Sequence, residues 1–202
     1  MSTTVAIVDN GGANIASVKF ALDRLGVESI LSADAERLRA AAHVILPGVG
    51  AAKDAMQRLH ALGLVDVIRG LTRPVLGICL GMQLLFESSA EGDTDGLGIL
   101  PGRVTKLTAR FDHPVPHMGW NQLQDQRSSP LLEGIGLKDY VYFVHSYAAP
   151  VNSATIASCE YGDRFAAVVQ RDNFFGTQFH PERSAQVGST LLSNFVRLGG
   201  CA

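Results

Sequence analysis

The chain has 202 residues, of which 47% are hydrophobic, and 17 basic and 19 acidic residues give it a net charge of −2 at pH 7. This length suits one well-packed domain, which we expect to span residues 1–202. The balanced charge, without a basic run, argues against binding to nucleic acid or to an anionic membrane. The start has no signal-peptide pattern, no segment is long enough for a membrane span, and three cysteines are too few for a disulfide framework. We therefore expect a cytoplasmic protein.

The first part of the chain alternates short apolar runs with helical patterns. A buried strand is predicted over Val5–Val8, a helix over about 15–25 that ends at Gly26, and a second strand over 28–31. A short helix over 35–42, a strand over 44–46 and helical material between 56 and 71 follow. This order predicts an α/β fold with one doubly wound, mostly parallel sheet flanked by helices.

Two motifs that could bind a cofactor do not have the required pattern. The loop at 9–14 follows the first strand but lacks the Gly-x-Gly-x-x-Gly spacing of a dinucleotide site, and no phosphate-binding loop of the Walker type occurs. His113 and His117 have the i, i+4 spacing of zinc ligands, yet Pro114 and Pro116 exclude the helix that would bring the two rings together. We expect no nucleotide cofactor and no metal.

The strand over 44–46 runs into the glycine-containing loop Pro47-Gly48-Val49-Gly50. Glycines allow peptide orientations that other residues avoid, so such a loop can present a backbone N–H to a developing oxyanion. A plain turn between a strand and a helix is the alternative interpretation.

Residues 77–81, Gly-Ile-Cys-Leu-Gly, have the pattern of a nucleophile elbow with cysteine in place of serine. A buried strand is predicted before Cys79 and a helix over 80–87 after it. The start of that helix would supply unpaired N–H groups and a positive dipole end, which stabilise negative charge on the sulfur, and the N–H of Leu80 would complement the oxyanion loop. The alternative is that Cys79 is a small buried apolar residue.

Beyond Gly96 the pattern changes to short strands and turns. Strands are predicted over 140–144, 155–161 and 165–170, as antiparallel additions to the same sheet system. A last helix over about 188–198 would end at Gly199-Gly200.

A further strand over 174–179 delivers His180-Pro181-Glu182 at its end. Pro181 stops further strand pairing and holds both side chains at a strand terminus, where the active sites of open α/β sheets lie. With Cys79 they supply a nucleophile, a base and an orienting carboxylate. Taken alone, the His180 and Glu182 pair could instead be a capped strand end.

These residues resemble the class I (triad) glutamine amidotransferase family over essentially the whole chain. The family pattern Gly-x-Cys-x-Gly-x-Gln is matched by Gly77, Cys79, Gly81 and Gln83, and its distant His-Pro-Glu by residues 180–182. The resemblance implies a triad of Cys79, His180 and Glu182 that hydrolyses glutamine through a cysteinyl thioester. It also implies oxyanion donors from Leu80 and from Gly48, Val49 or Gly50, and glutamine binding by Gln83, His145, Ser146 and Tyr147.

The chain resembles the branch of this family that serves histidine biosynthesis at Met82 and in the segments 117–121, 142–147 and 180–184. That resemblance implies a heterodimer with a (β/α)₈-barrel cyclase that receives the ammonia, and no cofactor. Asn10, Trp120 and Arg183 are then expected as partner contacts or gate residues, with core packing as the alternative for Trp120. Hydrolysis is expected to be weak until the partner is loaded, because a peptide within 47–50 would turn its carbonyl toward the oxyanion position. Residues 51–54, Ala-Ala-Lys-Asp, depart from the bulkier sequence expected there.

Three alternative functions stay open on the sequence alone. The same triad serves amidotransferase subunits of the anthranilate type and others, and also γ-glutamyl hydrolases that act without a partner. A catalytically silent subunit that only stabilises its synthase is the third.

Overall fold

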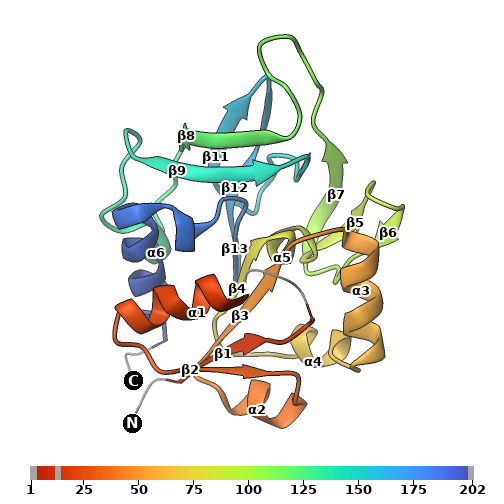
Figure 1. Ribbon diagram of the computed structural model, residues 1–202, viewed down its shortest axis with the longest axis vertical. Coiled ribbons are helices and arrows are strands. Elements are labelled where there is room, and N and C mark those ends of the chain that lie inside the picture. Colours follow the sequence, from red (N-terminus) through yellow and green to blue (C-terminus); the bar gives the residue numbers. More distant parts are fainter. Residues whose placement is uncertain (1–3, 12–14, 200–202) are drawn as a thin grey trace.

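A seven-stranded sheet forms the centre of the computed structural model, which describes residues 4–11 and 15–199 (Figure 1). Its strand order is β11-β12-β13-β4-β3-β1-β2. The parallel strands are β1 (Val5–Val8), β2 (Ser29–Ser32), β3 (His43–Gly48), β4 (Val75–Cys79) and β13 (Phe174–Thr177). Antiparallel β12 (Asp163–Arg171) and β11 (Thr155–Tyr161) complete one edge. The predicted fold class is confirmed. Positions 12–14 of the first loop, Gly200 and Cys201 lie outside the described residues.

Helices cover both faces of this sheet because alternate residues of its strands face opposite sides. Ala6 and Val8 belong to one core cluster, with α2 (Ala35–Ala40), α3 (Ala52–Ala61) and α4 (Val65–Arg69). Val5 and Ile7 belong to the other, with α1 (Ile15–Arg24) and α6 (Ala185–Arg197). Figure 1 shows α1 and α6 together on one side of the sheet and α3 and α4 on the other. Parallel strands buried on both faces need no polar alternation, which is why they are continuous apolar runs in the sequence.

The helix predicted over 80–87 is much shorter than expected. It forms a single turn, α5 (Leu80–Gln83), and β5 (Phe86–Ser89) starts where helix was predicted. β5 lies in a four-stranded sheet with β6 (Thr94–Asp95), β7 (Leu100–Lys106) and β10 (Tyr147–Ala148). Residues 80–86 are all buried, so their apolar run carries no period that could separate helix from strand.

The strand predicted over 140–144 forms but does not join the main sheet. It is β9 (Tyr140–His145), and it pairs with β8 (His117–Gln122) in a separate antiparallel ribbon. Val141 and Phe143 point into the core that holds α6, while Tyr140 is exposed. The ribbon thus covers the carboxyl end of the main sheet. One short 3₁₀ turn, Pro130–Leu132, lies between β8 and β9 in the chain, and another, Pro181–Arg183, follows β13.

The helical material predicted between 56 and 71 is interrupted at Gly63. This residue has φ +65, in the left-handed region, and it separates α3 from α4. The last helix starts three residues earlier than predicted, at Ala185, and ends at Arg197.

The turn between β4 and α5 packs directly on β3, and two glycines make this possible. A Cβ on Gly81 would overlap the carbonyl oxygen of Leu46. A Cβ on Gly77 would lie 2.7 Å from backbone atoms of Gly81 and Met82. Because all of these are backbone atoms of buried elements, they cannot move aside as a flexible side chain can. The elbow therefore has room for glycine and not for alanine at either position.

We predict that Gly81→Ala lowers the free energy of unfolding by about 3 kcal/mol or more, since the methyl group forces β3 and β4 apart. Denaturant unfolding measures this loss. Gly136→Ala is the matched control, because a Cβ there meets nothing closer than 3.9 Å and the residue has no positive φ. Equal stabilities for the two variants would contradict the account of the elbow.

Candidate active site

Cys79 sits at the turn where β4 ends and α5 begins. Its φ is 53° and its ψ is −109°, which is a strained conformation for a residue with a side chain. The strands β3 and β4 are in parallel register with Gly48 opposite Cys79, so the oxyanion loop starts beside the sulfur. The residue is 7% exposed. This is the geometry of a nucleophile elbow, with the sulfur held at the carboxyl end of the sheet.

His180 and Glu182 form a close pair next to Cys79. β13 runs parallel to β4 with Thr177 opposite Ile78, and this register brings the chain after β13 to the end of β4. The Nδ1 atom of His180 lies 2.7 Å from Oε1 of Glu182, whose side chain is fully buried. Ser184 braces the turn, because its hydroxyl donates to the His180 carbonyl oxygen and accepts from the N–H of Tyr142.

The charge state of His180 follows from its two neighbours. Burial alone would lower the pKa of His180, but hydrogen bonds and charge interactions with Cys79 and Glu182 outweigh it and raise the pKa to about 10. His180 is therefore protonated at neutral pH. An imidazolium between a sulfur that can carry negative charge and a carboxylate can give a proton to a leaving group.

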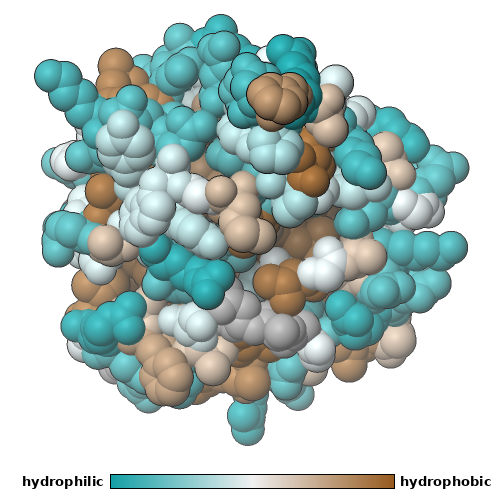
Figure 2. All heavy atoms as spheres, turned by 45° about the horizontal axis from the view of Figure 1, so that its top comes forward, coloured by the Kyte–Doolittle hydropathy of each residue, from teal (hydrophilic) through white to brown (hydrophobic). Residues whose placement is uncertain are grey.

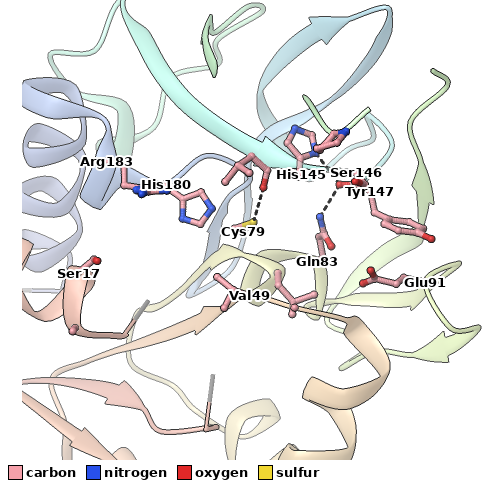
Figure 3. A pocket seen from close by; sticks show the side chains of 15 residues that line it. Ser17, Val49, Cys79, Gln83, Glu91, His145, Ser146, Tyr147, His180 and Arg183 are labelled. Carbon is pink, nitrogen blue, oxygen red and sulfur yellow. Dashed lines mark hydrogen bonds between the residues drawn. The ribbon is translucent and has the colours of Figure 1, made fainter. Parts of the chain in front are cut away.

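A cavity of about 720 Å³ opens in front of Cys79 (Figure 3). Its wall includes predicted residues from four segments: Val49 and Gly50, Cys79 to Gln83, 145–147, and His180 with Arg183. The full lining is Ala16, Ser17, Val49, Gly50, Cys79, Leu80, Gln83, Glu91, Pro116, Val144, His145, Ser146, Tyr147, His180 and Arg183. In Figure 3 the Cys79 and His180 side chains point toward each other across one end of the cavity. Two predicted residues lie just behind the wall: Glu182 beneath His180, and Gly48 packed against Leu80 and Gly81.

The three predicted contact or gate residues occupy different places. Asn10 is only 2% exposed, and its Nδ2 donates to the Pro47 carbonyl oxygen at 3.2 Å. Asn10 thus holds the loop of residues 47–50 from behind, and its role as a partner contact or gate residue stays a prediction. Trp120 is 52% exposed, so it is not a core residue. The Arg183 guanidinium lies over the Tyr142 ring, 5.4 Å from its centroid, at the cavity edge.

The exposed face around the antiparallel ribbon of β8 and β9 carries both hydrophobic and hydrophilic residues. Met118 and Tyr140 are exposed on β8 and β9 together with Trp120. Figure 2, which brings this end of the molecule forward, shows hydrophobic residues dispersed among hydrophilic ones. Such a surface is typical of a polar, non-obligate contact rather than of a continuous apolar interface.

Several cavity residues carry no signal in the sequence. Ser17 comes from α1, and Glu91 follows β5, where its Oε2 accepts from the N–H of Ala52 at the start of α3. Pro116 approaches from the loop before β8. A serine in a helix or a glutamate in a turn is ordinary, so only the folding of distant segments onto one cavity reveals them.

A buried pair of histidines stands behind the 145–147 segment. Nδ1 of His145 donates to the Tyr147 carbonyl oxygen at 2.9 Å, and Nε2 of His145 lies 3.0 Å from Nδ1 of His117. Since a carbonyl oxygen only accepts, His145 carries its proton on Nδ1, and His117 donates to it. Burial lowers the pKa of His117 to about 4 and that of His145 to about 3. Both rings are neutral at pH 7, and His117 pairs with His145 rather than with His113.

The described residues contain neither a metal-binding cluster nor a helix suited to span a membrane. Across 4–11 and 15–199 there is no group of three or more His, Cys, Asp or Glu side chains placed to hold a metal ion. In the same part of the chain no helix has the length and apolar character that a membrane span requires.

Comparisons with known proteins agree with this geometry. The model of the family Glutamine amidotransferase class-I matches residues 6–198. The chain is 55% identical over 196 residues to imidazole glycerol phosphate synthase subunit HisH of Xanthomonas axonopodis pv. citri (strain 306), covering 97% of this chain and 98% of that one. Subunit HisH 2 of Legionella pneumophila subsp. pneumophila is 53% identical over 194 residues, covering 96% and 98%. Among solved structures, PurLQS from Thermotoga maritima is similar in fold, with a TM-score of 0.73 and 18% identity over 98% of this chain and 99% of that chain.

We predict that the buried histidine pair makes the protein sensitive to acid. The pKa of each ring is about 4 or 3 in the folded state against 6.5 in the unfolded chain, so the unfolded state binds more protons below 6.5. Stability is therefore lost as the pH falls from 6.5 toward 4, by about 2 kcal/mol per ring at roughly pH 5. Urea unfolding at neutral and acidic pH measures the loss.

His117→Gln keeps a donor toward His145 but removes one proton-binding group, so the acid loss should fall by about half. The exposed His60→Gln controls for the removal of a histidine elsewhere. An acid loss that is identical in wild type and His117→Gln would contradict the assignment.

Proposed function

The chain belongs to the class I glutamine amidotransferase family, and we propose that it is the glutaminase subunit of imidazole glycerol phosphate synthase in histidine biosynthesis. The single observation that carries this proposal is the pairing of His180 with Glu182 beside Cys79 at an elbow. Identity of 53–55% to two HisH subunits over nearly the full chain supports the assignment to this synthase. We infer that residues 1–202 form one amidotransferase domain that works in the cytoplasm without a cofactor.

The reaction begins with attack of the Cys79 thiolate on the side-chain amide carbon of glutamine. The protonated His180 gives its proton to the departing ammonia, which leaves a γ-glutamyl thioester on the sulfur. Once the sulfur is acylated, its contribution to the high pKa of His180 is lost. His180 can then take a proton from the water that cleaves the thioester, while Glu182 holds the imidazole in the same tautomer.

The oxyanion formed in each step needs donors on the opposite side of the sulfur from His180. The N–H of Leu80 and one N–H from the loop of Gly48, Val49 and Gly50 are the candidates. Gly50 has φ +93, and this glycine conformation makes reorientation of the neighbouring peptide inexpensive. If this loop turned one N–H toward the oxyanion position only when the partner subunit holds its own substrate, glutamine hydrolysis would stay slow until then.

The cavity has the polar groups to hold the amino acid end of glutamine. The carboxylate of Glu91 suits the α-ammonium group, and the backbone of 145–147 together with Gln83 lines the same wall. Figure 3 shows Glu91 and Tyr147 on the side of the cavity away from His180. Glutamine can thus lie with its amide at Cys79 and its head at Glu91.

Ammonia released into water is protonated and no longer nucleophilic. We therefore propose that this chain forms a heterodimer with a cyclase subunit, a (β/α)₈ barrel, and passes the ammonia to it directly. That partner would carry out the lyase step and make imidazole glycerol phosphate and aminoimidazole carboxamide ribotide. Arg183 at the cavity edge and the exposed Trp120 are the residues we assign to the contact or gate.

We predict that Cys79→Ala abolishes glutamine hydrolysis and labelling by an alkylating ketone analogue of glutamine. The fold should be retained, because the substitution removes only a sulfur at the cavity wall. Coupled glutamate detection and mass spectrometry measure both losses. Retained turnover in a folded Cys79→Ala protein would reject the proposed chemistry.

We predict that Glu182→Gln lowers kcat by about 10²-fold or more, since the amide no longer stabilises the imidazolium or fixes its tautomer. KM should change little, because Glu182 does not line the cavity. Steady-state kinetics of the complex with the cyclase, with synthase turnover as a parallel readout, give both constants. Glutamine hydrolysis without glutamine-dependent synthase activity would favour a partner-free hydrolase or another amidotransferase subunit.

A further inference from the structure

A chain of hydrogen bonds runs from the backbone of the cavity wall to the reactive sulfur. The Nε2 group of Gln83 donates to the Tyr147 carbonyl oxygen at 2.7 Å and to Oε1 of Gln178 at 2.9 Å. The Nε2 group of Gln178 in turn lies 3.6 Å from Sγ of Cys79, within hydrogen-bond distance for sulfur. Gln178 was not among the predicted site residues, and it does not line the cavity.

The direction of every bond in this chain is fixed by its first acceptor. A carbonyl oxygen can only accept, so the end of Gln83 that faces Tyr147 must be its NH₂ group. The second hydrogen of that NH₂ group requires an acceptor, which sets the Oε1 atom of Gln178 toward Gln83. The NH₂ group of Gln178 is then left facing the sulfur, and it can only donate.

The position of Gln178 in the chain explains how it reaches Cys79 from behind. Gln178 and Phe179 form a bend directly after β13, and from this segment the Gln178 amide and the His180 imidazole both reach the Cys79 sulfur, while Phe179 packs in the core. Gln178 is fully buried and its N–H donates to the Ala167 carbonyl oxygen. One segment thereby places a buried amide behind the sulfur and an imidazole in front of it.

We propose that Gln178 is a catalytic residue that donates a hydrogen bond to the Cys79 sulfur and stabilises its anionic form. No proton is transferred: the amide supports the thiolate before it attacks, and again when the thiolate is expelled as the thioester is cleaved. In the thiol form the sulfur can instead donate to the Val144 carbonyl oxygen, 3.9 Å away. The inference rests on the proposed function, because it concerns the nucleophile of that reaction.

Charged and titratable groups around the sulfur come from several elements. His180, backed by Glu182, faces it from the segment after β13, and the neutral His145 lies on β9. Glu91 and Arg183 complete the charged lining of the cavity. None of these groups is altered by a substitution at Gln178, so a change in sulfur reactivity would report the amide itself.

The test is the rate at which iodoacetamide alkylates Cys79, followed by site-resolved mass spectrometry in Gln178→Met and Gln178→Glu. Methionine has a similar volume and no donor, and we expect about tenfold slower alkylation near neutral pH, as for the loss of one hydrogen bond to a charged group. Glutamate keeps an acceptor for Gln83 but presents an oxygen to the sulfur, so it should slow alkylation at least as much.

The two variants distinguish a hydrogen bond from Gln178 to the sulfur from a role in which Gln178 only holds Gln83 in place. If Gln178 served only to hold Gln83, Gln178→Glu would react at the wild-type rate, and that result would overturn the proposal, as would wild-type rates in both variants. Cys159 is the internal control for folding, because burial raises its pKa to about 12 and it should stay unlabelled in every folded variant.

Gln170→Met is the matched substitution. Gln170 lies on β12, where its Oε1 accepts from the Ser129 hydroxyl, and this variant should alkylate like the wild type. Because iodoacetamide reacts without glutamine, the alkylation rates test Gln178 even if the wild-type protein, with its cyclase partner, fails to hydrolyse glutamine. That failure would count against the proposed function alone.

Discussion

The site depends on one close approach, the packing of the turn at Cys79 directly onto β3. Gly81 lies against the Leu46 carbonyl oxygen, and this contact leaves Cys79 to absorb the change of direction at φ 53°. A strained residue persists only where its surroundings determine it on every side. Here the surroundings are the buried backbones of β3 and β4, paired through Gly48 and Cys79, so the oxyanion loop and the nucleophile are placed by the same contact.

The other half of the site depends on the segment that follows β13. After β13 ends at Thr177 the chain bends at Gln178 and Phe179; the side chains of Gln178 and His180 reach the sulfur, and Phe179 packs in the core. The 3₁₀ turn of Pro181–Arg183 then returns Glu182 beneath His180. Because β13 pairs in parallel with β4, whose end carries Cys79, this register determines which residues after β13 reach the sulfur.

The sequence predicts those features that depend on local pattern. The parallel strands, the elbow and the His-Pro-Glu turn follow from runs and motifs a few residues long, and the structure places Cys79, His180 and Glu182 close together. Glu91, Ser17 and Gln178 could not be found in this way, because each is an ordinary residue that matters only through partners far away in the chain. The early end of α5 was missed for a related reason: a fully buried run has no polar side to reveal its period.

Burial alone does not decide the charge of a histidine in this protein. His145 and His180 line the same cavity and are both buried, yet their pKa values move in opposite directions, to about 3 and about 10. His145 meets a carbonyl oxygen and a second imidazole, which cannot compensate for lost hydration, whereas His180 meets a carboxylate and a sulfur that can carry negative charge. The charged imidazole thus lies beside Cys79, where the proposed mechanism delivers a proton, whereas His145 and His117 are neutral and hydrogen-bonded within the wall.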